Sequence, residues 1–244
     1  MAAGLSPGRL LEARDAGSGL HPLDRALAVL RLAAEPGGAD PAEWPIALRD
    51  RRLVAIHRQT FGDYLACLVD CPDCGERQEF DLSAGALGEA IGDSPEPETF
   101  AGEGWQVSLR PLDSRDLAAA ARAGSLDRAV EALAERAVAA ILAPGGTAGL
   151  AELPAAAREA VVARIGERES AADLAIELRC PDCGHVWTTG LDIGEHLWAQ
   201  IDRHSDRLLG EVAALAERFG WSEAEILALP ASRRRFYLAV EAVR

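Results

Sequence analysis

The chain has 244 residues, 49% of them hydrophobic, which is enough apolar material for one large domain or two small ones. Its formal net charge is −14, and a charge of that sign repels nucleic-acid backbones and anionic membranes. Every basic residue is arginine, which excludes lysine Schiff-base chemistry and the lysine of a phosphate-binding loop.

The N-terminal region, residues 1–70, is predicted to be helical. Its opening sequence, MAAGLSPGRLLEARD, lacks the basic segment and apolar stretch of a signal peptide, and no later window is apolar enough to span a membrane. We therefore expect a cytoplasmic protein. Leu23, Leu27 and Leu30 share one face of a first helix, and a second helix is predicted from Asp50 to Val69.

Two copies of the sequence CPDCG begin at Cys71 and Cys180. A strand is predicted after the first copy, from Glu76 to Leu82, and strands are predicted on both sides of the second copy. Each copy is therefore expected at the turn of a β-hairpin. The first knuckle with its strand is assigned to residues 71–83, and the second knuckle with its strands to residues 174–191.

The two cysteine pairs are predicted to form one metal site. A Cys-x-x-Cys turn places two thiolates on the same side of a tight loop, and two such turns supply the tetrahedral ligand set that zinc requires. Roughly 100 residues separate the pairs, against roughly 15–20 in the common four-cysteine pattern, but a folded insertion closes that gap because loop-closure entropy grows only logarithmically. The expected ligands of Zn²⁺ are Cys71, Cys74, Cys180 and Cys183.

Two other interpretations of the cysteines stay open. A redox dithiol pair is disfavoured because the residues after each CPDCG continue as a strand, whereas a thioredoxin-type motif opens a helix. The other is a site that has lost its metal or that uses His185 in place of one cysteine. His57, His196 and His204 are isolated on helical patterns and are expected to be ordinary surface or core residues. Cys67 is expected to be a small buried hydrophobe.

Residues 84–173 are predicted to form an inserted, mostly helical subdomain. It begins with a linker rich in proline, glutamate and glycine, from Gly92 to Gly104, and a strand from Trp105 to Leu109 follows. The apolar spacing then predicts one helix that buries Leu126 through Ile141 and another that buries Leu153 through Ile165.

The C-terminal region, residues 192–244, has the clearest helical pattern. Asp192 and Glu195 fit a capping box, apolar residues then recur as a seam interrupted by Ser205, and Gly220 ends the helix. The seam residues are Trp198, Ile201, Leu208, Val212, Leu215 and Phe219. Such a seam must be covered by another part of the chain or by a partner protein.

A second capping box, Ser222 with Glu225, opens the next helix, and the spacing of the two helices is that of a helix-turn-helix. DNA reading is disfavoured because Glu223 and Glu225 place carboxylates in the turn that would face phosphates. A last helix follows, and its aromatic residues and arginines are the types that protein interfaces favour. The expected partner-binding residues are Trp221, Arg233, Arg234, Arg235, Phe236 and Tyr237.

The C-terminal phrases LLGEV, LAERFGWSEAEILALP and RRRFYL resemble the ending of the baseplate hub and hub-assembly-chaperone family of contractile phage tails and contractile injection systems. Near the N-terminus, LDRAL, RDRRL and FG, followed by CPDCGE, resemble the zinc-knuckle version of that family. The resemblance implies a non-enzymatic role in forming or assembling the baseplate hub around its spike. The shorter members lack these cysteines, so the zinc site is expected to be a scaffold.

These features predict an α+β fold that is mostly helical, with a small discontinuous zinc ribbon and a helical insertion. The predicted function is a structural or chaperone-like component of the baseplate hub, with hub or spike proteins as partners and with no nucleic acid, membrane or small-molecule substrate. The alternative is a zinc-ribbon and helix-turn-helix regulator that binds nucleic acid, and a redox enzyme is the third hypothesis.

Overall fold

The structure, a computed structural model, describes residues 4–34 and 37–240 and has an α+β fold. The α-helices are α1 (Pro7–Gly17), α2 (Pro22–Ala33), α3 (Ile46–Phe61), α4 (Ala84–Ala90), α5 (Ser114–Ala121), α6 (Leu126–Ala137), α7 (Ala155–Glu169), α8 (Ile193–Phe219), α9 (Glu223–Ala228) and α10 (Ala231–Ala239). The strands are β1 (Tyr64–Asp70), β2 (Arg77–Ser83), β3 (Glu98–Gly102), β4 (Trp105–Leu109), β5 (Val138–Ala143), β6 (Gly146–Thr147), β7 (Ala175–Arg179) and β8 (Val186–Gly190). Short 3-10 turns are η1 (Pro41–Glu43), η2 (Leu150–Glu152) and η3 (Ser170–Ala172).

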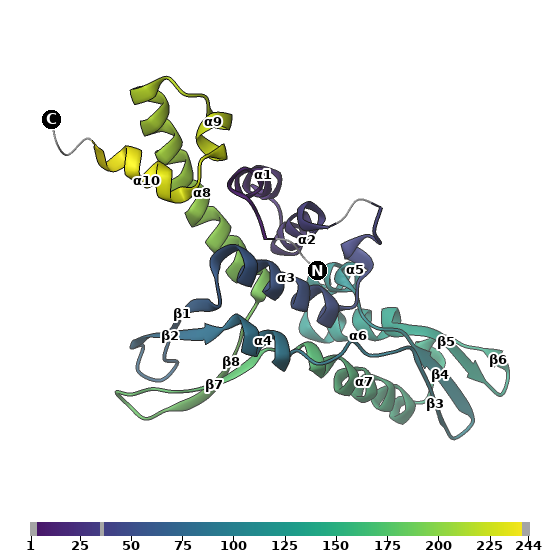
Figure 1. Ribbon diagram of the computed structural model, residues 1–244. Helices are drawn as coiled ribbons and strands as arrows, with labels where there is room; N and C mark the ends of the chain where they lie inside the picture. The colour runs from purple at the N-terminus through teal and green to yellow at the C-terminus, as the bar shows by residue number, and fades with distance from the viewer. Residues whose placement is uncertain (1–3, 35–36, 241–244) are drawn as a thin grey trace.

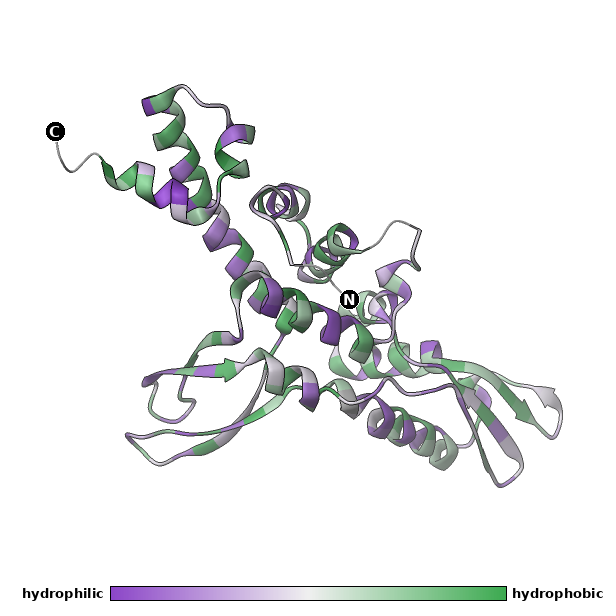
Figure 2. Cartoon of the chain, in the orientation of Figure 1, coloured by the Kyte–Doolittle hydropathy of each residue, from purple (hydrophilic) through white to green (hydrophobic). Residues whose placement is uncertain are grey.

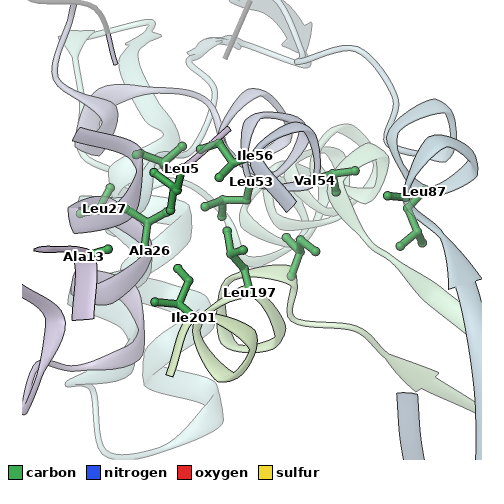
Figure 3. Close-up of a cluster of buried hydrophobic side chains, with 14 of the residues drawn as sticks. Leu5, Ala13, Ala26, Leu27, Leu53, Val54, Ile56, Leu87, Leu197 and Ile201 are labelled. Carbon is green, nitrogen blue, oxygen red and sulfur yellow. The ribbon is translucent and has the colours of Figure 1, made fainter. Parts of the chain in front are cut away.

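Helices α1, α2, α3 and the first half of α8 meet in the main hydrophobic core (Figure 3). Leu53 and Ile56 of α3 and Leu197 and Ile201 of α8 belong to this cluster, and each is at most 1% exposed. Burying a side chain of that size contributes roughly 1.5–3 kcal/mol. Of the apolar face predicted for α2, Leu27 and Leu30 belong to this cluster, whereas Leu23 is only half-buried.

Helix α1, which the sequence pattern did not predict, braces the middle of α8. A Cβ atom on Gly17 would lie 2.4 Å from the indole ring of Trp198, so the two helices touch where only hydrogen fits. Arg14 adds ion pairs from α1 to Asp202 at 2.9 Å and to Asp206 at 2.5 Å. The packing and the charges together hold α8 against the N-terminal region.

The helix predicted from Asp50 to Val69 is wrong at its C-terminal end, because α3 stops at Phe61 and strand β1 begins at Tyr64. In β1, buried or half-buried residues alternate with exposed ones, which is the period of a strand and not of a helix. The alternation places Cys67 on the same face as the buried Leu65. Cys67 is half-buried there and packs against the edge of the main core.

The two cysteine motifs lie at the ends of two antiparallel hairpins, β1–β2 and β7–β8. The strands predicted beside both motifs are therefore confirmed, within a residue or two at their ends. Both hairpins leave the central helices in the same general direction (Figure 1). Ser83 ends β2 and caps α4 by accepting a hydrogen bond from the N–H of Ala86.

The segment between the hairpins packs around a second hydrophobic cluster, formed mainly by β4, β5, α6 and α7. Two predictions within it are wrong. The expected linker contains β3, which pairs with β4, and the helix expected to bury Ile141 ends at Ala137. Ile141 lies instead in β5, opposite Val107 in the four-stranded antiparallel sheet β3-β4-β5-β6. Ile141 follows Ala137 by four residues, which is the spacing of one helical turn. Over so short a stretch, a buried strand residue can have that spacing too.

Helix α8 runs on from the main core to a third, smaller cluster, where α9 and α10 pack against its second half (Figure 1). The core of this C-terminal unit is formed by Val212, Leu215 and Ile226. Gly220 ends α8 with a left-handed φ of 68°, as expected for a helix stop. The capping box of α9 is also confirmed.

The seam predicted on α8 is buried along most of its length, and its interruption has a structural reason. Ser205 is fully buried, and its hydroxyl donates to the carbonyl of Leu10 in α1 at 3.4 Å. Phe219 departs from the prediction because 38% of its surface is exposed. No helix in the described ranges combines the length and the apolar character needed to cross a membrane.

Candidate metal centre

The two CPDCG sequences fold as the same turn at the ends of the two hairpins. In each turn the N–H of the first cysteine donates to the carbonyl that follows the glycine, from Cys71 to Glu76 and from Cys180 to His185, at 2.9 Å in both. The glycine of each motif has a φ of +76°, which a residue with a Cβ atom adopts only at a cost. Identical sequences thus give identical turns, and each turn directs two sulfurs to one side.

The four sulfurs of the two turns converge, as predicted. The Sγ atoms of Cys71 and Cys183 are 3.7 Å apart, those of Cys74 and Cys180 are 3.6 Å apart, and all four lie within 4.8 Å of one another. Four thiolates about 2.3 Å from a central zinc ion would be separated by about 3.8 Å, the edge of the tetrahedron. The donor set and its spacing therefore fit a tetrahedral metal ion, although they do not identify the metal.

The charges of these thiols also favour a cation. The N–H of Cys183, followed by that of Asp182, lowers the pKa of the Cys180 thiol to about 7. The N–H of His185 lowers the pKa of Cys183, but burial and the neighbouring thiols outweigh it and raise that pKa to about 12. Thiols so close together cannot all ionise unless a positive charge joins them, and a metal ion supplies that charge while displacing their protons.

The surroundings of the site bear on the alternative ligands. Four cysteine sulfurs complete a tetrahedral set, and the ring of His185 stacks with that of Trp187 at 6.0 Å. A strand follows each motif, whereas a dithiol oxidoreductase motif opens a helix. Cys71 and Cys180 are 2% and 1% exposed, so the inner half of the site is closed to solvent.

The structure brings into contact two of the histidines that were expected to be isolated, and it places the third beside the end of α3. His57 in α3 lies 5.6 Å, ring to ring, from His196 in α8, and Phe61 lies 4.5 Å from His204, which is two turns further along α8. The spacing of His196 and His204, two turns apart, could have placed both on one side of a helix. Nothing in the local sequence could have placed them beside α3.

His57 has an unusual environment. Its side chain is fully buried, and neither ring nitrogen has a partner at hydrogen-bonding geometry within the described part of the chain. Burial lowers its pKa to about 4, His196 adds to the decrease, and the backbone of Gly62 partly opposes it. Burial also lowers the pKa of His196, and Arg203 adds to that effect. These groups are therefore neutral when α8 is packed against α3 near neutral pH.

The residues predicted to bind a partner occupy different positions in the C-terminal unit. Arg233, Arg235 and Phe236 are exposed, whereas Trp221 and Tyr237 are half-buried beside its small core. Arg234 is 5% exposed and cannot serve a partner as predicted. Its Nε donates to the carboxylate of Glu211 in α8 at 2.7 Å, and its Nη1 donates to a backbone carbonyl at 2.7 Å.

The C-terminal unit and the four-cysteine centre are the two features from which a function can be inferred. Comparisons of the chain with models of known protein families, with curated proteins and with solved structures each found no match.

Proposed function

We propose that this protein is a non-enzymatic structural or assembly component of the baseplate hub of a contractile phage tail or contractile injection system. The observation that carries the proposal is a four-cysteine centre that joins hairpins from distant parts of the chain and uses all four tetrahedral positions for protein ligands. A centre of that kind holds a fold together and leaves no position for a substrate. The resemblance of the C-terminal sequence to the hub family suggests the baseplate hub as the place of this structural role.

The metal in this proposal is Zn²⁺, held by Cys71, Cys74, Cys180 and Cys183. Four thiolates in a tetrahedron suit zinc or iron, and zinc adds no redox chemistry to a structural role. Bound zinc would hold the β1–β2 and β7–β8 hairpins together at their ends, which otherwise have only short strands to stabilise them.

Metal analysis of the purified full chain tests this part of the proposal. We expect one zinc per chain after expression with both zinc and iron in the medium, and we expect Cys74→Ala to lose it. Cys67→Ala is the matched control, because Cys67 is the cysteine outside the site. Iron as the main metal, or zinc retained without Cys74, would contradict the assignment.

The proposed partners are hub or spike proteins, and the proposed docking region is the C-terminal unit built from α9, α10 and the second half of α8. This unit exposes arginine and aromatic side chains, which are the types enriched in protein interfaces. Nucleic acid is a poor partner for it, because Glu223 and Glu225 occupy the first turn of α9 and the chain has a net charge of −14.

Sedimentation of the native, tagged protein tests the functional assignment. We expect the protein to travel with sheathed particles, or with a small complex that contains hub or spike proteins, when lysate is fractionated by size. A lysate that lacks the sheath protein is the control, because the hub complex should then remain soluble. Free protein in every fraction would refute the proposal, and a salt-dependent complex with duplex DNA would favour the regulator hypothesis.

A further inference from the structure

Four aromatic rings form a continuous patch on the C-terminal unit. Phe219 stacks on Trp221 with ring centroids 4.7 Å apart, Trp221 contacts Tyr237 at 5.1 Å, and Tyr237 contacts Phe236 at 5.7 Å. We call these four residues the aromatic patch. Phe236 is 64% exposed and Phe219 is 38% exposed, so the patch begins in the small core and ends in solvent.

The apolar surface continues along α10 beyond these rings. Val240, one turn after Phe236, is 47% exposed, and Figure 2 shows α10 hydrophilic near its start and hydrophobic towards its end. Large apolar side chains exposed side by side, with a polar rim, are typical of a protein-binding surface.

Positive charge borders the aromatic patch. Arg233 lies one turn before Phe236 and Tyr237 on α10, and Arg235 is exposed close by. Within the described ranges neither arginine is paired with a carboxylate, whereas the buried Arg234 between them is paired with Glu211. These two arginines leave positive charge beside the exposed rings, on a chain whose net charge is −14.

We propose that this surface binds an acidic amphipathic helix of another protein, with apolar side chains on the aromatic patch and carboxylates on Arg233 and Arg235. Arginine and carboxylate form charge-assisted hydrogen bonds, and the negative charge of the rest of the chain is largely screened beyond a Debye length of about 10 Å. A second copy of this chain is disfavoured as the occupant, because a twofold interface would bring the unpaired arginines of both copies into one contact.

A peptide selection tests the inference with a defined probe. The library consists of helical peptides of about 15 residues, with leucine, phenylalanine or alanine at apolar positions and glutamate or lysine, equally frequent, at polar positions. It is selected on the metal-loaded full chain. We expect glutamate to be enriched over lysine, and the charge reversal Arg233→Glu with Arg235→Glu to weaken the selected peptides by at least about tenfold.

Matched variants separate this surface from general charge effects. Arg122→Glu with Arg128→Glu makes the same change in net charge at exposed positions of the insertion and should leave binding unchanged. Phe236→Ala should weaken binding about tenfold, whereas Leu126→Ala, which removes a 79% exposed side chain elsewhere, should not. Thermal melting and metal content show that each variant is folded.

Several outcomes would overturn the inference. These are no enrichment, enrichment of lysine, equal loss in both charge-reversed variants, or dimerisation of the chain through Phe236 in analytical ultracentrifugation. Nucleic acid bound at the same arginines would also overturn it. The inference rests on the docking region of the proposed function, but peptide binding needs no contractile particle, so its failure and the failure of cosedimentation can be told apart.

Discussion

Replacing His57 with leucine should make the protein markedly less sensitive to acid. The imidazole of His57 is fully buried between α3 and α8, and burial lowers its pKa to about 4. Leucine has a similar volume and no group to protonate. The variant therefore removes a titration while it keeps the packing of the two helices.

The sign and size of the effect follow from the two pKa values. In the unfolded chain the imidazole takes up a proton below its ordinary pKa of about 6.5, whereas in the folded chain it stays neutral until about pH 4. Acid therefore favours the unfolded state throughout that window. From pH 7.5 to pH 5, His57 alone should reduce the free energy of unfolding by about 2 kcal/mol.

Urea unfolding of the metal-loaded full chain at pH 7.5, 6 and 5 measures this difference. Loss of metal in acid affects every variant equally, so it cancels when variants are compared. At pH 7.5 the leucine variant should be at least as stable as the parent, because it leaves no buried N–H without a partner. His21→Asn is the control, since His21 is an exposed helix cap and asparagine caps helices well.

This prediction is wrong if the leucine variant loses as much stability as the parent between pH 7.5 and pH 5. It is also refuted if His21→Asn alone removes the acid sensitivity. In that case the protonation that unfolds the protein would occur outside the contact between α3 and α8.

Three further predictions concern packing, charge and metal. Arg234→Met should destabilise the C-terminal unit by about 2 kcal/mol, because Glu211 loses its partner. Adding Glu211→Leu removes the unpaired carboxylate and should restore the protection of α10 amides in hydrogen exchange. No recovery in the double variant would contradict the role of the pair. Gly17→Ala should cost about 1–3 kcal/mol in thermal melting because its methyl would meet Trp198, whereas Gly8→Ala, in open space on the same helix, should be neutral or stabilising. Removing the metal with a chelator should cost at least about 4 kcal/mol, or roughly 8–16 °C in melting temperature, and an unchanged melting curve would exclude a structural metal.

The parts of the fold that could be predicted from sequence are those governed by residues close together in the chain. The turn at each CPDCG depends on hydrogen bonds across six residues, so its hairpin was recognisable from the motif and its neighbours. The cap at Asp192 and the capping box at Ser222 depend on contacts three residues away, so they were recognisable for the same reason, although Glu195 does not return the bond that a full box at Asp192 requires. Duplication of one motif was enough to suggest a shared metal site, because tetrahedral coordination needs two such turns.

The errors lie where distant packing outweighs local preference. The run after Phe61 suits a helix or a strand by its apolar content, and pairing with β2 makes it a strand. Likewise β3 lies in a proline-rich stretch that resembles a linker until β4 pairs with it. A strand needs a second strand to pair its backbone hydrogen-bonding groups, and the sequence of a segment does not show which other segment will pair with it.

The same distinction separates side chains that look alike in sequence. Arg233, Arg234 and Arg235 are three identical neighbours, and the packing of α10 on α8 turns the middle one onto Glu211 while the outer two face solvent. No sequence pattern indicates that His57 and His196 are in contact, yet the packing of α8 on α3 places their rings 5.6 Å apart. Local sequence sets which backbone a segment prefers, but the burial and charge of a side chain depend on which distant element covers it.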